Sequence, residues 1–204
     1  MNCILSKISD PYFNLAAEEY LLKSRDEDFF LLYRNEPSII VGKHQNALAE
    51  INWEFASKHK IKVARRLSGG GTVYHDPGNL NFSFIRKGLE GKLVDFKKYT
   101  APIREVLSKM GIETKFEGHN SLTLNGFKVS GNAEHVFKKR VLHHGTLLFS
   151  SSLENLEEAI RTRPDQYSDK AVKSVRAEVA NICESLDKKI TIEEFESGIM
   201  NFFR

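Results

Sequence analysis

The sequence has few of the features that mark secreted, fibrous or membrane-spanning proteins. Its only cysteines, Cys3 and Cys183, are too few for a disulfide framework, and they are too far apart to form a metal-binding motif. Five prolines and 13 glycines exclude a collagen-like repeat. No apolar run approaches the ~20 residues of a membrane span, and residues 1–7 lack a signal-peptide pattern. We therefore expect a cytoplasmic protein with no membrane partner.

The chain also lacks a strong excess of charge of either sign. Its 30 Lys and Arg residues against 27 Asp and Glu give a net charge of +3. A nucleic-acid-binding protein usually carries a concentrated basic surface, so a small anionic ligand fits better and no nucleic-acid partner is expected. Because a domain averages about 150 residues and no internal repeat occurs, the sequence predicts one domain over 1–204.

Hydrophobic periodicity and capping signals predict the secondary structure. Helices are expected over 11–24, 53–60, 95–110, 153–163 and 191–204, and strands over 29–34, 38–43, 62–67, 72–74, 80–85 and 141–150. Asp10-Pro11 is typical of a helix start, and Thr191 with Glu194 has the form of a capping box. Strands in adjacent pairs with interspersed helices predict a two-layer α+β fold, with a largely antiparallel or mixed sheet packed with helices.

Asn125-Gly126 predicts a hairpin with a two-residue turn. In that register Leu122 pairs with Val129, and residues that pair directly point to the same face. One face is expected to hold Leu122, Leu124, Phe127 and Val129, and the other Ser121, Thr123, Lys128 and Ser130.

Residues 65–76, Arg-Arg-Leu-Ser-Gly-Gly-Gly-Thr-Val-Tyr-His-Asp, form the most informative motif. Three consecutive glycines let backbone N–H groups converge on an anion, and Arg66 can add a forked contact. A strand follows the glycines, so the motif is neither a Walker loop nor a dinucleotide fingerprint, which both lead into a helix. It favours phosphate binding, with a plain loop flanked by solvated arginines as the alternative.

A second motif, residues 126–133, places Lys128 on the polar face of the hairpin. Its ammonium group can approach a carboxylate or phosphate oxygen, or it can simply be exposed to solvent. The neighbours His143 and His144 point to opposite faces of a strand, so both cannot bind one metal ion, and no metal site is expected. We expect His143 to be a core imidazole, whereas one of the two histidines can face a pocket.

Four segments resemble the lipoate-protein ligase A family, within the wider group of biotin and lipoate ligases. They are residues 11–19, 37–46, 65–76, and 127–131 together with 143–148. The Arg-Arg-x-Ser-Gly-Gly-Gly run followed by Lys-x-Ser-Gly is specific to this group. The resemblance implies the fold of a biotin/lipoate ligase catalytic domain.

The resemblance also implies a reaction in two steps. Lipoate and ATP, with Mg²⁺, would give lipoyl-AMP and pyrophosphate. A lysine of an acceptor domain, in a 2-oxoacid dehydrogenase E2 subunit or the glycine cleavage H protein, would then take the lipoyl group. Neither step needs an enzyme-bound acyl group, so catalysis would consist of positioning and electrostatic stabilisation.

Site residues follow from the resemblance position by position. Lys128 would be the catalytic residue, bridging carboxyl and phosphoryl oxygens. The residues implied to bind ATP or lipoyl-AMP are Arg66, Gly71, Thr72, Val73, Tyr74, His75, Asn79, Asn120, Lys128, Ser130 and Asn132. Apolar strand residues would hold the acyl chain, each buried methylene contributing about 0.8 kcal/mol.

The sequence departs from the family pattern at three places. Ser121 follows Asn120 where the family usually has Asn-Asp, and Asn132 stands where Ser or Thr is commoner. The chain stops at Arg204, about where the family's catalytic domain ends. The accessory domain that assists adenylation is therefore expected to be absent, or to act as a separate partner.

Two other functions remain open on the sequence. One is an octanoyl or lipoyl transferase that lacks the adenylation step. Such an enzyme needs a cysteine nucleophile, whereas Cys3 and Cys183 both have the surroundings of structural cysteines. The other is a non-catalytic module that binds a lipoyl group or a nucleotide.

Overall fold

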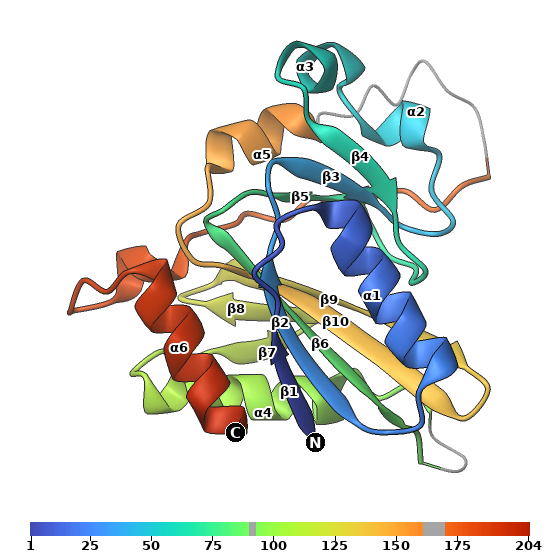
Figure 1. Cartoon of the computed structure of the whole chain (residues 1–204). Coiled ribbons are helices and arrows are strands. Elements are labelled where there is room, and N and C mark those ends of the chain that lie inside the picture. The colour runs from blue at the N-terminus through green and yellow to red at the C-terminus, as the bar shows by residue number, and fades with distance from the viewer. Residues whose placement is uncertain (90–92, 161–169) are drawn as a thin grey trace.

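The chain folds into two β-sheets with helices packed around them (Figure 1). The computed structural model describes residues 1–89, 93–160 and 170–204. The helices are α1 (Pro11–Ser24), α2 (Ala47–Glu50), α3 (Trp53–Lys58), α4 (Phe96–Lys109), α5 (Leu153–Ala159), the 3₁₀ helix η2 (Ile182–Ser185) and α6 (Ile192–Phe203). The strands are β1 (Asn2–Leu5), β2 (Phe29–Arg34), β3 (Ser38–Val41), β4 (Lys62–Arg65), β5 (Val73–His75), β6 (Asn79–Lys87), β7 (Lys115–Glu117), β8 (Ser121–Leu124), β9 (Phe127–Phe137) and β10 (Arg140–Leu148).

The larger sheet has seven strands in the order β1-β2-β6-β10-β9-β8-β7, and the smaller has three in the order β4-β3-β5. All pairs are antiparallel except β1 with β2 and β3 with β4, which are parallel. After β2, the turn at Glu36-Pro37 sends the chain into the other sheet instead of closing a hairpin. The expected α+β fold with a mixed sheet is confirmed.

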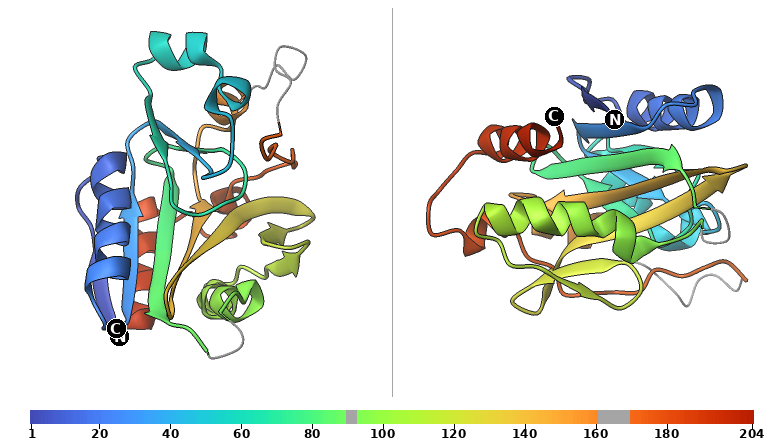
Figure 2. Two further views of the ribbon diagram at one scale, coloured as in Figure 1. Left: turned by 90° about the vertical axis from the view of Figure 1, so that its right-hand side faces the viewer. Right: turned by 90° about the horizontal axis from the view of Figure 1, so that it is seen from below.

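The two faces of the larger sheet are covered differently. One face packs against α4 and α6 in the main hydrophobic core, whereas α1 lies on the opposite side of the long strands (Figure 2). Strand β6 shows the division: Leu80, Phe82 and Phe84 enter the main core, and the alternate residues are Asn79, Asn81 and Ser83. All of them are buried. We call the side with α1 and these polar residues the inner face.

The smaller sheet lies next to the inner face, and its own outer face forms a separate core. Ile39, Val41 and Tyr74 pack there with Ala56 of α3 and Ala159 of α5. The alternate residues of β3 and β5 point the other way, because successive strand residues alternate between faces. A layer of buried polar groups therefore lies between the two sheets.

Most local signals in the sequence are confirmed. Helix α1 begins at Pro11 with Asp10 as its cap, and Thr191 and Glu194 form the expected capping box of α6. The glycine run lies between β4 and β5. The helix expected over 153–163 ends at Ala159, and the last three of those residues lie outside the described part. The short elements α2, β7 and η2 were not predicted, because each is too brief to show a period.

The register predicted for the hairpin is confirmed next to the turn, where Leu124 pairs with Phe127 and Thr123 with Lys128, and it is wrong by one residue beyond Lys128. Asn125 and Gly126 form the two-residue turn, both with positive φ, but Leu122 pairs with Ser130 rather than with Val129. Val129 is the extra residue of a β-bulge, and it points into the main core. The bulge puts Ser130 on the core side and brings Gly131 onto the face of Lys128. Phe127, expected in the core, is exposed.

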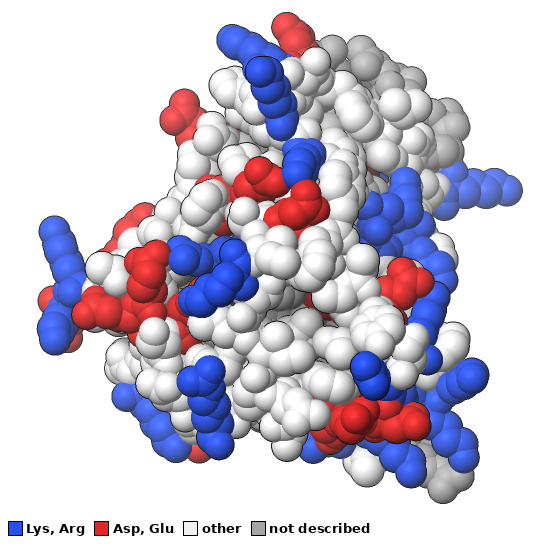
Figure 3. Space-filling view, in the orientation of Figure 1, with Lys and Arg blue, Asp and Glu red and all other residues white. Residues whose placement is uncertain are grey.

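Charged side chains of both signs occur on the surface, and Lys and Arg gather towards the right-hand edge of the face shown in Figure 3. Near β4, Lys62 bridges Asp10 and Glu36 at 2.5 and 2.6 Å. No helix within the described ranges is long and apolar enough to cross a membrane.

The capping box makes a testable contribution to stability. Thr191→Ala removes the side-chain oxygen that accepts from the Glu194 backbone N–H, so we expect unfolding in urea to become easier by about 1 kcal/mol. Thr191→Ser keeps that oxygen and should stay close to the parent chain. Equal loss in both variants would mean that the methyl group, not the cap, is what matters.

Candidate active site between the two sheets

A buried carboxylate, Glu18 of α1, lies at the centre of the polar layer. Tyr33 and Ser83 donate to its Oε1, and Nδ1 of His144 lies 2.9 Å from its Oε2. Burial raises the pKa of Glu18, but the contacts with His144, Ser83 and Tyr33 lower it by more, so the pKa lies below its usual value. Glu18 is therefore an ionised carboxylate that joins α1 to β2, β6 and β10.

His144 extends this network to the glycine loop. Its Nε2 lies 2.6 Å from the Oγ of Ser68, which is fully buried and accepts a hydrogen bond from Nε of Arg66 at 3.0 Å. Because the ionised Glu18 can only accept, Nδ1–H of His144 donates to it, and the Ser68 hydroxyl can donate to Nε2. The four side chains form a continuous chain of hydrogen bonds.

Arg66 shapes the glycine loop from within. Its Nη2 donates to the carbonyl oxygens of Gly69 and Gly71, both at 2.7 Å, and its Nη1 donates to that of Ile40. Burial lowers the pKa of Arg66 to about 10, while the charge of Glu18 opposes this shift. The sequence analysis expected this guanidinium to contact the ligand directly. In this structure its donors instead hold the loop in shape.

The loop is closed on its other side by the segment after residue 170. The Ser174 hydroxyl accepts from the Thr72 backbone N–H and from Gln45, both at 3.0 Å, and it donates to Glu50. The Thr72 hydroxyl donates to Gln45 as well. The Thr72 backbone N–H, which is a suitable donor for an anion, thus donates to the hydroxyl of Ser174.

Lys128 lies on the inner face because of the bulge. Its Cε and Nζ come within 3.3 and 3.4 Å of the position that a Cβ on Gly131 would take, with Thr146 at 4.0 Å. Burial lowers the pKa of Lys128. Backbone hydrogen bonds to Glu178 and Ala180 fix the strand here. Among residues 1–89, 93–160 and 170–204, the ammonium has neither an acidic partner nor a hydrogen-bond acceptor.

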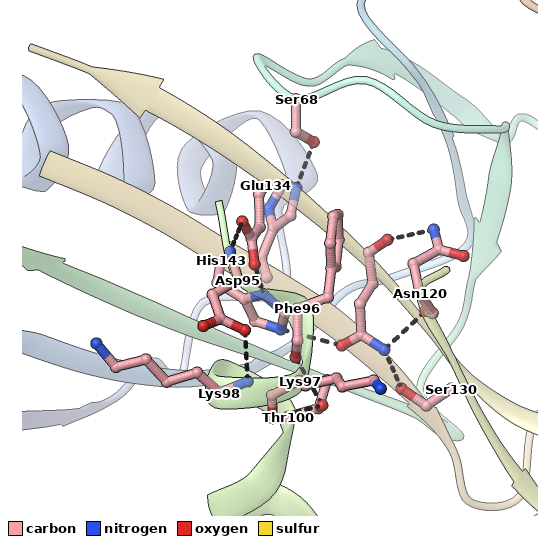
Figure 4. Close-up of polar contacts among 12 residues, drawn as sticks. Ser68, Asp95, Phe96, Lys97, Lys98, Thr100, Asn120, Ser130, Glu134 and His143 are labelled. Atoms are coloured by element: carbon pink, nitrogen blue, oxygen red, sulfur yellow. Dashed lines mark hydrogen bonds and ion pairs between the residues drawn. The ribbon is translucent and has the colours of Figure 1, made fainter. Parts of the chain in front are cut away.

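Two of the expected ligand-binding side chains, Ser130 and Asn132, lie on the core face of the strand, and Asn120 bonds to its backbone. Asn132 donates to the Asn120 carbonyl oxygen and to the Ser130 hydroxyl, and Asn120 donates back to the Asn132 carbonyl oxygen (Figure 4). His143 bridges Asn132 and Glu134 and is completely buried. These hydrogen bonds therefore brace the strand within the protein, and His143 is the core imidazole that we expected.

The residues after the glycine run that were expected to bind the ligand lie in two different places. Tyr74 packs in the outer core of the small sheet, where burial raises its pKa, and Val73 next to it is half-buried. His75 and Asn79 are buried between the sheets. Burial, together with Arg66 and His144, lowers the pKa of His75 to about 3, so the ring is neutral.

A cavity of about 340 Å³ opens between α1 and β4 beside this network. Its walls carry both polar and apolar side chains: Tyr12, Glu18, Glu19, Arg65 and Arg66, and Leu15, Ala16, Val63, Ala64, Leu67 and Leu142. Leu142, His144 and Thr146 are alternate residues of β10 and share the inner face. The cavity at Leu142 and Lys128 near Thr146 therefore both lie beside β10.

Neither cysteine has the surroundings of a nucleophile. Cys183 packs against the main core, and burial raises the pKa of its thiol. Cys3 donates to the Phe203 carbonyl oxygen. Within the described part of the chain, no cluster of three or more histidine, cysteine or acidic side chains could hold a metal ion.

Several residues of this site were not singled out by the sequence analysis. Asn35, Gln45, Asn81 and Ser174 are the clearest examples. One signal was available: Asn79, Asn81 and Ser83 alternate with large apolar residues, which marks a polar strand face. That pattern alone does not tell whether the polar face meets solvent or a second sheet.

Comparison with known proteins agrees with this geometry. Lipoate-protein ligase LplJ of Bacillus subtilis is 46% identical over 195 residues, covering 95% of this chain and 59% of that protein. The chain thus spans less than two thirds of the length of this relative.

Two solved structures have the same fold over 99% of this chain. Plasmodium falciparum LipL1 in complex with lipoate superposes with a TM-score of 0.83 at 29% identity, covering 61% of that chain. A bipartite lipoate protein ligase from Thermoplasma acidophilum, studied with its E2 lipoyl domain, gives 0.85 at 25% identity, covering 81% of that chain. The family profile for the lipoyl protein ligase A/B catalytic domain matches residues 10–204. The chain therefore belongs to the lipoyl protein ligase A/B catalytic-domain family.

Proposed function

We propose that this chain is the catalytic domain of an ATP-dependent lipoate-protein ligase. It would activate lipoate to lipoyl-AMP and transfer the lipoyl group to a lysine of an acceptor domain. The observation that carries the proposal is the partly buried ammonium group of Lys128, which has neither an acidic partner nor a hydrogen-bond acceptor among the described residues. A desolvated cation that lacks a partner is costly, and an anionic ligand that places oxygens at Nζ removes that cost.

Lys128 suits both steps. In the first, its charge would stabilise the negative charge that builds up as the lipoate carboxylate attacks the α-phosphorus and pyrophosphate leaves. In the second, it would stabilise the oxyanion that forms as the acceptor amine attacks the acyl carbon and AMP leaves. The Gly131 N–H donates to Thr146 beside it at 3.2 Å, so this part of the strand is held in place.

The cavity has the size and place of an acyl-chain site. Leu142 at its wall and Thr146 beside Lys128 are four residues apart on one strand, about 13 Å at ~3.3 Å per residue. A short acyl chain with its carboxyl group at Lys128 would run along β10 towards this cavity. Leu15, Val63 and Leu67 would provide apolar contact.

The nucleotide would lie against the glycine loop, whose conformation Arg66 holds. Backbone groups of Gly71 to Tyr74 and the side chains of His75 and Asn79 are the proposed contacts. Mg²⁺ enters the proposal bound to ATP. Binding of phosphate at the Thr72 N–H requires the Ser174 hydroxyl to leave it.

The partners belong to the proposal as well. Lipoyl domains of 2-oxoacid dehydrogenases and the H protein are the proposed acceptors, supported by the study of the Thermoplasma ligase with its E2 lipoyl domain. Because that ligase is bipartite and this chain covers 59% of the Bacillus protein, we propose that an accessory domain assists adenylation. The two free cysteines support a cytoplasmic location.

The central test measures the mass gain of a purified lipoyl domain. Donors are lipoate with ATP and Mg²⁺, with or without a supplied accessory domain, and separately preformed lipoyl-AMP. We expect gain with lipoyl-AMP, and gain from ATP at least when the accessory domain is present. Lys128→Ala should lose both by 100-fold or more, on the order of one lost electrostatic contact in a transition state. Lys115→Ala, at an exposed lysine on β7, is the control. Full activity of Lys128→Ala would refute the assignment.

A pH-dependent stability difference should accompany Lys128. Its pKa is lower in the folded chain than in the unfolded chain, so at neutral pH the buried cation destabilises the fold. That cost is fully present below the folded pKa and disappears as the pH rises through it. Lys128→Met should therefore be at least as stable as the parent chain at pH 7, and its advantage should shrink towards pH 10. Urea unfolding at several pH values measures this; an advantage that grows with pH would contradict it.

Cysteine replacement separates the ligase from a cysteine-dependent acyltransferase. Since Cys183 packs against the core with a raised pKa, we expect Cys183→Ser to keep lipoyl-AMP-dependent transfer within about threefold, and to unfold somewhat more easily because a hydroxyl replaces a part-buried thiol. Transfer from octanoyl carrier protein without ATP that disappears in this variant would favour the transferase instead. Ligand binding without any turnover in the parent chain, even with the accessory domain, would favour a binding module.

A further inference from the structure

The buried imidazole of His75 has one nitrogen without a partner. Its Nδ1 lies 3.0 Å from Nδ2 of Asn35, whereas its Nε2 has no hydrogen-bond partner among the described residues. Only 5% of the surface of His75 is exposed to solvent, so bulk water does not supply the missing partner. A buried polar group that lacks a partner costs about 1–3 kcal/mol and therefore calls for an explanation.

The hydrogen bonds around Asn35 fix the direction of every donor. Nδ2 of Asn14 donates to the backbone carbonyl oxygen of Ile8, which can only accept, so the orientation of the Asn14 amide is set. The same Nδ2 donates to Oδ1 of Asn35 at 2.8 Å. Asn35 must then turn its Nδ2 towards His75 and donate to Nδ1.

This chain of donors selects the tautomer of His75. Because Nδ1 accepts, the proton of the neutral ring is on Nε2, and the unpartnered atom is an N–H donor. Burial and the charge of Arg66 oppose a second proton on the ring. The ring of His75 is therefore a neutral hydrogen-bond donor.

Two further buried amides next to His75 are also incompletely bonded. Asn79 and Asn81 bond to each other at 2.9 Å, and Oδ1 of Asn79 and Nδ2 of Asn81 have no partner in the described ranges. Asn81 pairs with Thr146 on one side and with Tyr33 on the other. Extending the β2–β6 register by one pair places Asn35 beside Asn79. The unsatisfied atoms therefore belong to one part of the inner face, close to Lys128.

We propose that Asn35 is a positioning residue that holds His75 as the Nε2–H tautomer, so that this N–H, together with Nδ2 of Asn81, binds an anionic oxygen of the substrate. The proposal rests on the proposed ligase function for the identity of the substrate. The oxygen belongs either to a phosphoryl group of the nucleotide or to the lipoate carboxylate. Asn14 acts one step further away, by orienting Asn35.

The decisive variant is Asn35→Asp, which keeps the shape of the side chain. One carboxylate oxygen can still accept from Asn14, but the other must accept from Nδ1–H of His75, which moves the ring proton away from Nε2. Both hydrogen bonds survive while the donor that faces the ligand is lost. Asn201→Asp is the charge-matched control, because Asn201 is exposed on α6.

The test has two parts. In the first, ¹⁵N NMR of histidine-labelled, ligand-free protein reads the protonation of each His75 nitrogen. We expect Nε2–H in the parent chain and in Asn201→Asp, and Nδ1–H in Asn35→Asp. An Nδ1–H ring in the parent chain, or an unchanged or doubly protonated ring in Asn35→Asp, would overturn the role of Asn35 whatever the enzyme's substrate.

The second part measures binding by calorimetry. The probes are ATP, lipoate, and an acyl-adenylate analogue in which a sulfamate replaces the phosphate. Asn35→Asp should weaken binding of the analogue by about tenfold or more, the effect of losing one hydrogen bond to a charged group, in protein whose cooperative thermal unfolding shows that it is folded. Weaker ATP binding identifies the phosphoryl group, and weaker lipoate binding the carboxylate. Equal affinity of all variants overturns the ligand contact. If the parent chain binds no probe, the proposed function fails and the contact with it, while the NMR result on the tautomer stands.

Discussion

The ionised carboxylate of Glu18 is the interaction on which the rest of the site depends. A charge buried between two sheets is stable only if its oxygens are fully hydrogen-bonded, and Glu18 meets this need with donors from β2, β6 and β10. That requirement fixes α1 against the larger sheet. Through His144 and Ser68 it also fixes Arg66, and Arg66 determines the path of the glycine loop of the smaller sheet. One desolvated charge thus orders groups from both sheets.

The two faces of strand β9 have different roles. The inner face presents Lys128 above Gly131, where a side chain of any size would crowd its ammonium group. The core face holds a closed network of His143, Glu134 and Asn132, whose hydrogen bonds stay within the protein (Figure 4). A rigid, fully bonded network beneath and an incompletely bonded layer above is the arrangement expected of a site that is built before its ligand arrives.

Much of the fold could be read from the sequence, because the signals are local. Asp10-Pro11, the capping box at Thr191 and the turn at Asn125-Gly126 all depend on residues a few positions apart. What could not be read depends on distant partners. The sequence alone does not show whether the N–H groups of Arg66 are available to a ligand. The folded loop shows that they donate to the carbonyl oxygens of Gly69 and Gly71.

The bulge at Val129 also sets a limit on the length of the hairpin. Side chains alternate strictly along a strand, so the extra residue is what allows an apolar Val129 in the core and Lys128 with Gly131 on the opposite face. Removing a single residue between the turn and Gly131 would restore a regular ladder and exchange the two environments. The strand could still pair, but either the cation or the glycine would then be turned towards the main core. The number of residues between the turn and Gly131 is therefore as important to the candidate site as the identity of Lys128.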